Sequence, residues 1–272
     1  MEQYLWLIPL GFIIGAYGTL VGAGGGFVVV PLLLLLYRNE NPEIITSISL
    51  AVIFFNALSG SVAYARMRRI DYKAGILFSA AAIPGAILGA LTTAFIPRLA
   101  FDVLFGLLLV IASVYLLLHP IKVQGTSSRE TLQAHSQNPI EANHSRKKRL
   151  YKLAVGMVLS LCVGYLSSLL GIGGGIIHVP VLVHLLDFPV HIATATSHFI
   201  LAVMALTGTI VHIATGTFYH GIRRTIALSI GVICGAQLGA LFSNRLSGTW
   251  IIRGLAVALG LVGLRILLIA LQ

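Results

Sequence analysis

The sequence predicts an all-α integral membrane protein, because three of its properties do not fit a water-soluble fold. Its 272 residues are 57% hydrophobic and only 10% charged, whereas soluble domains carry about 25% charged residues. The mean hydropathy is +0.96. Long stretches also contain no charged residue at all, and each reaches the ~20 residues that a helix needs to cross the hydrocarbon core of a bilayer.

These stretches define eight expected membrane elements. Six contain no Asp, Glu, Lys or Arg, namely residues 3–37, 44–65, 74–97, 153–186, 188–222 and 225–244. Two more, residues 101–118 and 250–271, carry isolated charges. The first stretch lacks the basic start and the cleavage site of a signal peptide, so we expect it to be retained.

A polar, basic segment divides the chain. Residues 1–118 form a first membrane repeat, residues 119–149 a basic linker and residues 150–272 a second repeat. A second basic cluster contains Arg66, Arg68, Arg69 and Lys73. The positive-inside rule places both basic segments on the cytoplasmic side. The net charge of +10 therefore indicates membrane orientation, and no nucleic-acid partner is expected, since the basic residues do not line an amphipathic face.

The two halves repeat one another. GAYGTLVGAGGGFVVVP, residues 15–31, recurs as GYLSSLLGIGGGIIHVP at 164–180, an offset of 149, and the segments 45–64 and 84–91 recur at 193–212 and 234–241. We therefore expect two repeats of about four transmembrane helices each, with a Gly-broken first helix in each repeat. Four elements per half orient the halves alike and place Arg223 and Arg224 on the cytoplasmic side. Alternatively, each break makes two crossings, which gives five plus five spans in inverted repeats.

The breaks are expected at two glycine-rich segments, Gly22, Gly24, Gly25 and Gly26 in one half and Gly171, Gly173, Gly174 and Gly175 in the other. Each Gly costs a helix about 1 kcal/mol relative to Ala, so adjacent glycines favour unwinding. The freed backbone groups cannot face lipid, and a helix that restarts there directs N–H groups toward a site suited to anions. Alternatively, the glycines only permit close helix packing, which is our interpretation of the GxxxG pairs 85–89 and 235–239.

Polar side chains follow each break. The hydroxyl and amide candidates for substrate binding are Thr46, Ser47, Ser49, Asn56, Thr194, Thr196 and Ser197, although each hydroxyl could instead bond a carbonyl of its own helix. Histidines occur in the membrane elements of the second half alone: His178, His184, His191, His198 and His212. We expect His198 at the site, His198 and His212 in proton coupling, and His178 hydrogen-bonded in the core. The two cysteines lack a CxxC partner and are expected to be buried free thiols.

On GAGGGFVVVP, GIGGGIIHVP and the segments ITSISLAVIFFNALSG and ATATSHFILAVMALTG, the sequence resembles the sulfite exporter TauE/SafE family of membrane permeases. The resemblance implies a carrier of the bacterial inner membrane that moves sulfur-containing anions such as sulfite, sulfonates or sulfoacetate. It also implies that residues 24–26, 173–175 and 195–199 lie at the substrate path.

The leading functional hypothesis is a secondary transporter of small anions, with the bilayer and a small anion as its partners and without a cofactor or bound metal. No GxxxxGK[ST] motif is present, so an ion gradient would drive it. Whether the protein forms a homodimer is left open. One alternative is a metal-cation carrier that uses the membrane histidines, although its helices contain almost no carboxylate. Another is an intramembrane hydrolase with Ser59 or Ser197, which would lack GxSxG and HExxH.

Overall fold

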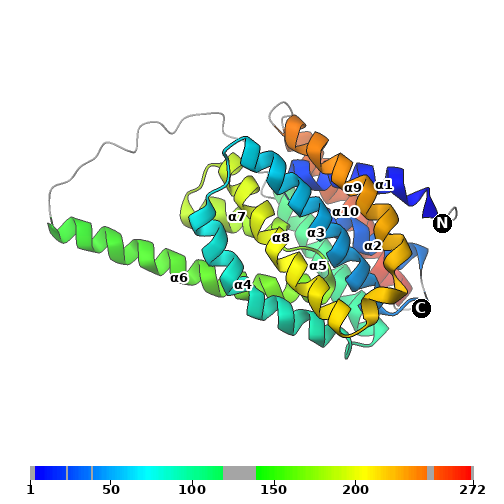
Figure 1. Cartoon of the computed structure of the whole chain (residues 1–272). Coiled ribbons are helices and arrows are strands. Elements are labelled where there is room, and N and C mark those ends of the chain that lie inside the picture. The colour runs from blue at the N-terminus through cyan, green and yellow to red at the C-terminus, as the bar shows by residue number, and fades with distance from the viewer. Residues whose placement is uncertain (1–3, 23, 38, 119–138, 244–247, 271–272) are drawn as a thin grey trace.

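The computed structural model describes residues 4–22, 24–37, 39–118, 139–243 and 248–270, and within these residues it contains helices and no strands (Figure 1). The all-α prediction is confirmed. The helices are α1 (Leu7–Val21), α2 (Gly26–Leu36), α3 (Pro42–Arg66), α4 (Tyr72–Thr93), α5 (Arg98–Leu118), α6 (Pro139–Leu170), α7 (Gly175–Leu186), α8 (Val190–Ala214), the short 3₁₀ helix η2 (Thr217–His220), α9 (Ile222–Phe242) and α10 (Gly248–Ala270).

Five of the described helices are long and apolar enough to cross a membrane. They are α3, α4, the Tyr151–Leu170 part of α6, α8 and α9. Three shorter apolar helices, Leu7–Val21, Gly26–Leu36 and Leu259–Ala270, accompany them. Large apolar side chains such as Ile76, Leu88, Val158 and Ile230 are exposed on the outside, as expected of a surface that faces lipid.

The glycine-rich segments break the first stretch of each half into two helices, as predicted. The backbone φ is positive at Gly22 (84°), Gly24 (77°) and Gly25 (76°), and again at Gly171 (66°), Gly173 (82°) and Gly174 (47°). Each of the second three glycines follows its counterpart by 149 residues. A left-handed conformation costs other L-residues about 1–2 kcal/mol, whereas Gly adopts it freely. The local conformation of each turn therefore follows from its glycines.

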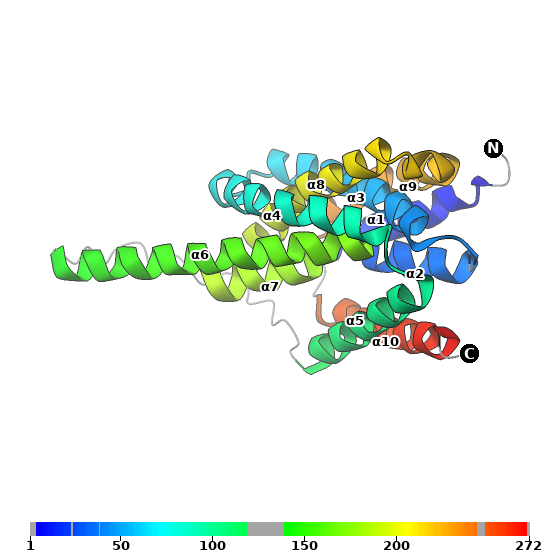
Figure 2. The ribbon, with the colours of Figure 1, turned by 90° about the horizontal axis from the view of Figure 1, so that it is seen from below.

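The central helices α3 and α8 cross in an antiparallel direction. Leu50, early in α3, packs against Gly208, late in α8, whereas Gly60, late in α3, packs against His198, early in α8. In the sequence alignment Leu50 corresponds to His198 and Gly60 to Gly208. The same contact thus occurs twice, with the two halves exchanged. The helices α5 and α10 are also antiparallel, since Gly106 faces Leu267 and Gly260 faces Ser113; Figure 2 shows them as a separate pair.

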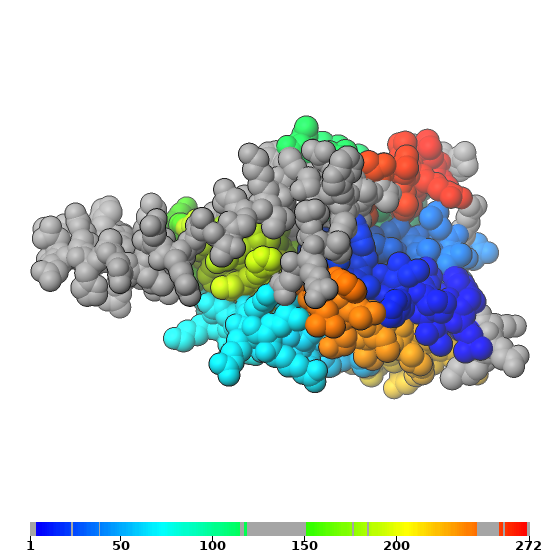
Figure 3. All heavy atoms as spheres, turned by 90° about the horizontal axis from the view of Figure 1, so that it is seen from above, coloured from blue at the N-terminus to red at the C-terminus, as the bar shows by residue number. Residues whose placement is uncertain are grey.

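Two further pairs of helices pack backbone to backbone. A Cβ on Gly85 of α4 would overlap the carbonyl oxygen of Leu161 in α6, and a Cβ on Gly235 of α9 would overlap that of Phe12 in α1. The sequence offsets that aligned the halves relate these two contacts as well. Figure 3 shows α1 and α9 side by side on one face. The packing interpretation of both GxxxG pairs is therefore confirmed.

Helix direction bears on the two topologies that the sequence left open. Because α3 and α8 are antiparallel, the basic cluster after α3 and Arg224 after α8 lie at opposite ends of this pair. Like-oriented halves would place them at the same end. The described chain also has five α-helices before the linker and five after residue 138. Both features favour the inverted alternative over our preferred arrangement, and the repeat organisation itself stays a prediction.

Arg224, which the positive-inside argument placed on the same side as the basic cluster, is not a free loop charge in the structure. Its guanidinium lies 2.7 Å from a carboxylate oxygen of Glu40 and 4.1 Å from the ring centre of Tyr37. An arginine that is paired with a carboxylate and stacked on an aromatic ring differs from the free loop charge that the rule counts.

Two other expectations concern the linker and the cysteines. Residues 119–138 of the predicted linker lie outside the described residues, whereas residues 139–149 are helical and form the start of α6 (Figure 2). Both Cys162 and Cys234 are free thiols, but they are exposed and not buried. They lie on α6 and α9, where a side chain that faces outward meets lipid. Apolar composition alone does not distinguish that surface from the core.

Candidate substrate site at the paired glycine turns

The two glycine turns meet where α3 and α8 cross. A Cβ on Gly26 would overlap the carbonyl oxygen of Ile172 in the second turn, so the two backbones touch. Ile53 of α3 and Leu201 of α8, which occupy equivalent positions in the alignment, pack against both turns. The structure therefore brings the two predicted glycine segments together at one place in the centre of the fold.

A chain of hydrogen bonds holds the first turn. The side-chain amide of Asn56 donates to the carbonyl oxygen of Gly24 at 2.9 Å, and the Thr19 hydroxyl donates to Oδ1 of Asn56 at 3.0 Å. The Tyr64 hydroxyl in turn donates to the carbonyl oxygen of Thr19 at 3.0 Å. All these side chains are buried. Thr19 and Tyr64 were not predicted; a polar residue in the last turn before the glycines was the available signal for Thr19.

The second turn is held differently. The Ser49 hydroxyl donates to the carbonyl oxygen of Gly171 at 2.7 Å. Thr46 packs against the same glycine, but within the described part of the chain its hydroxyl has no hydrogen-bond partner. The hydroxyl of Ser197, which corresponds to Ser49 in the other half, is likewise buried without a partner among the described residues. Thr194 packs against Gly22.

His198 lies beside the first turn. It is fully buried, and its ring meets the ring of Tyr64 edge-on, with the centroids 5.5 Å apart. A Cβ on Gly60 would lie only 2.8 Å from its Cδ2. The Thr194 carbonyl, one helical turn earlier, is near the ring, but neither ring nitrogen makes a well-formed hydrogen bond within the described residues.

Two short helices start at this crossing. The N–H groups of Val28 and Val29 donate to the carbonyl oxygen of Gly25, and those of Ile177 and His178 donate to Gly174. Among the described residues, the N–H groups of Gly26 and Phe27 at the start of α2 have no such acceptor, as is usual in the first turn of a helix. Both positive helix ends thus face a polar centre whose described residues include no carboxylate, which favours an anion.

Several predicted residues lie elsewhere. The Ser47 hydroxyl donates to the Ile44 carbonyl oxygen of its own helix, and the Thr196 hydroxyl accepts from the backbone N–H of Asp71 at the α3–α4 connection. Two further α8 hydroxyls, those of Thr207 and Thr209, donate to carbonyl oxygens four residues earlier. For these hydroxyls, a structural role explains the contacts better than substrate binding.

The histidines do not gather at one site. Along α8, His198 and His212 are 14 residues apart, which corresponds to ~21 Å of helix. His212 contacts Glu43 at the far end of α8, with 4.0 Å between Nδ1 and Oε1. His178 contacts Ser160 and the carbonyl oxygen of Gly174 in the core, as expected. The His184 side chain lies outside the described residues, and the described chain contains no group of three His, Cys, Asp or Glu placed to hold a metal.

Several apolar membrane-length helices, two glycine-broken elements and a buried polar centre between them define the class of protein: a multi-pass membrane transporter with discontinuous helices. The sequence model of the family described as sulfite exporter TauE/SafE matches residues 7–266. The chain belongs to this family of membrane transporters.

Relatives support the class over the full length of the chain. A probable membrane transporter protein of Bacillus subtilis, YunE, is 31% identical over 97% of this chain and 97% of its own. A probable membrane transporter protein of Methanocaldococcus jannaschii is 27% identical over 98% and 97%, and YdhB of Bacillus subtilis is 26% identical over 88% and 89%. No solved structure matches the chain.

Proposed function

We propose that this transporter moves small sulfur oxyanions or organosulfonates, of the sulfite and sulfoacetate kind, through the crossing of α3 and α8. The convergence of two helix starts, at Gly26 and Gly175, on a buried polar centre whose described residues include no carboxylate carries this proposal. The family description, a sulfite exporter, supports sulfur oxyanions as the substrate class.

The substrate would be held by groups that make no well-formed hydrogen bond within the described residues. These are the N–H groups of Gly26 and Phe27 at the start of α2, the hydroxyls of Thr46 and Ser197, and the ring of His198. Leaving a buried donor unpaired costs about 1–3 kcal/mol, and the oxygens of a sulfite or sulfonate group would satisfy several at once. Asn56 and Ser49 hold the glycine turns in shape. The remaining glycines permit the left-handed backbone.

Transport would proceed as in carriers whose substrate site lies between two broken helices, by movement of the surrounding helices around that site. An ion gradient would drive it, with His198 and His212 as the candidate proton carriers. We place the protein in the inner membrane of a bacterial cell, with residues 119–149 on the cytoplasmic side, and assign it no catalytic activity.

A binding panel on the purified full-length protein tests the substrate class. Sulfite, sulfate, thiosulfate and sulfoacetate should each be compared with chloride, zinc and nickel by the shift of the thermal unfolding midpoint. A ligand at 100 times its Kd stabilises a protein by about 2.7 kcal/mol, so a sulfur oxyanion should give a clear, saturable shift. A shift with zinc or nickel and none with the anions would instead support the metal-carrier alternative.

A further inference from the structure

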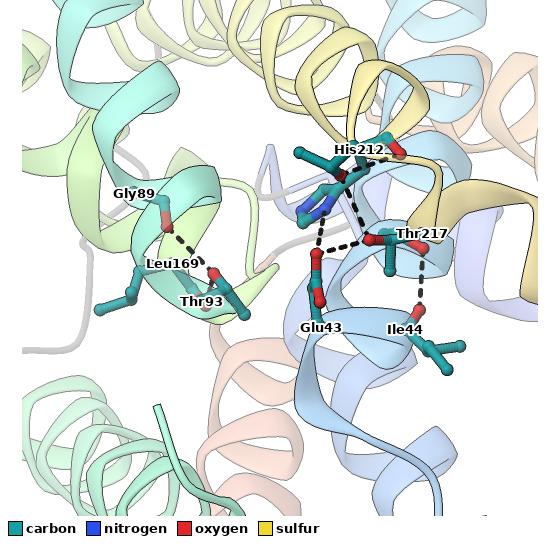
Figure 4. Close-up of polar contacts among 9 residues, drawn as sticks. Glu43, Ile44, Gly89, Thr93, Leu169, His212 and Thr217 are labelled. Carbon is teal, nitrogen blue, oxygen red and sulfur yellow. Dashed lines mark hydrogen bonds and ion pairs between the residues drawn. The ribbon is translucent and has the colours of Figure 1, made fainter. Parts of the chain in front are cut away.

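Glu43 and His212 meet at the end of the fold away from the basic α3–α4 connection. Glu43 lies in the first turn of α3 and His212 in the last turn of α8, and Figure 4 shows the carboxylate directed at the imidazole. The His212 side chain is 1% exposed and that of Glu43 is 24% exposed. A buried imidazole therefore contacts a partly exposed carboxylate.

The two side chains lie so that protonation of His212 would form an ion pair with Glu43. The distance from Nδ1 to Oε1 is 4.0 Å, which is too long for a hydrogen bond, and neither ring nitrogen has a hydrogen-bond partner within the described residues. On protonation both imidazole nitrogens become donors. A charge-assisted N–H···O bond is about 2.7–2.9 Å long, so a protonated His212 would draw the two side chains together by about 1 Å.

The same carboxylate also contacts η2, the connection between α8 and α9. The Thr217 hydroxyl of η2 donates to the same oxygen of Glu43 that faces His212 (Figure 4). Thr217 in turn exchanges a hydrogen bond with Thr215, whose hydroxyl contacts the carbonyl oxygen of His212. A stronger bond between Glu43 and His212 would thus tie three elements together: the start of α3, the end of α8 and η2.

The other charged and titratable groups at this end are paired or exposed. Arg224 of α9 is paired with Glu40, whereas Arg223 of α9 and His220 of η2 are exposed. Of the other helices that pack against α8, α4 begins beside Phe199, so its Lys73 lies at the opposite end. Lys152 of α6 pairs with Asp187, which precedes α8. His178 of α7 is bonded to Ser160.

The other half offers no equivalent pair. The alignment that relates the halves places His191 at the position of Glu43 and Tyr64 at that of His212. His191 is exposed, and Tyr64 donates its hydroxyl to Thr19. The carboxylate and histidine therefore occur together at one end of the α3–α8 pair.

We propose that Glu43 and His212 form the proton-binding site that couples transport to the proton gradient. The proton enters past the partly exposed Glu43, binds the imidazole of His212 and closes this end of the molecule by tying α8 and η2 to α3. Its release to water reopens that end. This inference rests on the proposed function, and it separates two roles that the sequence left together: His212 carries the proton, and His198 faces the substrate.

The test measures proton and anion movement in the same proteoliposomes of full-length protein. Vesicles that contain a pH-sensitive dye receive a gradient of radiolabelled sulfite, and both signals are recorded for the wild type, Glu43→Gln, His212→Gln and Thr217→Val. The matched control is His191→Gln, since His191 is an exposed histidine on the same helix. Anion binding, followed by thermal stabilisation, shows that each variant is folded.

We expect Glu43→Gln and His212→Gln to lower sulfite-driven proton movement by at least about tenfold, while sulfite binding and sulfite exchange stay within about twofold of the wild type. Thr217→Val should weaken coupling less, and His191→Gln should not change it. Full proton coupling in Glu43→Gln, while the wild type moves sulfite, would overturn this inference alone. Absence of sulfite movement in the wild type would overturn the proposed function, and this inference with it.

Discussion

The hydroxyl of Ser49 in α3 donates a 2.7 Å hydrogen bond to the carbonyl oxygen of Gly171, the first glycine of the second turn. The corresponding residues of the other half are Ser197 and Gly22, and the Ser197 hydroxyl has no partner among the described residues. The two turns are thus alike in backbone conformation and differ in the side chains that hold them.

This difference predicts that two alanine substitutions affect different properties, one stability and the other anion binding. Ser49→Ala should lower the free energy of unfolding by about 0.6–1.7 kcal/mol, between the mean and the maximum for hydrogen bonds between membrane helices, because it leaves the Gly171 carbonyl unpaired. Ser197→Ala removes no hydrogen bond within the described residues, so it should mainly weaken anion binding. Thermal unfolding in detergent, with and without sulfite, measures both effects. Equal losses of stability would contradict the assignment.

The glycine turns should not tolerate a side chain. Gly24→Ala should abolish transport and lower stability, since its Cβ would overlap Leu201 and its φ is +77°. Gly216→Ala is the matched control: its φ is +83°, but nothing lies within 4 Å of the added Cβ. The control therefore measures the cost of the backbone strain alone, about 1–2 kcal/mol, without an overlap of side chains. Similar losses of stability and flux in both variants would show that packing at the turn is unimportant.

Asn56 should position the first turn for substrate. Asn56→Ala removes the bonds to Gly24 and Thr19, so we expect sulfite affinity to fall about tenfold, or ~1.4 kcal/mol. Thr207→Ala serves as the control, because Thr207 bonds a carbonyl of its own helix. Binding isotherms of the two variants decide the matter, and unchanged affinity in Asn56→Ala would remove Asn56 from the site.

Helix direction predicts where labels react. After Cys162 and Cys234 are replaced by alanine, single cysteines at Arg66 and Tyr219, which are both exposed, should react with a membrane-impermeant maleimide from opposite sides of the membrane. The antiparallel α3 and α8 place these positions at opposite ends. Labelling of both cysteines from the same side would restore the like-oriented arrangement.

Local features of the fold could be predicted from the sequence, whereas the partners of most side chains in distant segments could not. The left-handed glycines at 22–25 and 171–174 follow from local backbone chemistry. The partner of Thr196, the backbone of Asp71, depends on a connection 125 residues away and leaves no pattern in α8. The same holds for Tyr64, which resembles an ordinary apolar helix residue in the sequence.

Topology was open because composition does not show whether a chain reverses at a break. The segment 3–37 is long enough for one bent crossing or two short ones, and its charge pattern is the same in either case. In the structure, Gly25 at the end of the turn packs against Ile14 of α1. The chain therefore folds back on itself at the glycines, and the direction of every later helix depends on that reversal.

The most direct measurement for the central claim is the uptake of radiolabelled sulfite into proteoliposomes that contain the wild-type protein, Gly24→Ala or Gly216→Ala. We predict saturable uptake by the wild type that unlabelled thiosulfate or sulfoacetate reduces, uptake near that of empty vesicles for Gly24→Ala, and substantial uptake for Gly216→Ala. Wild-type uptake no greater than that of empty vesicles, or full uptake by Gly24→Ala, would contradict an anion path at the paired glycine turns.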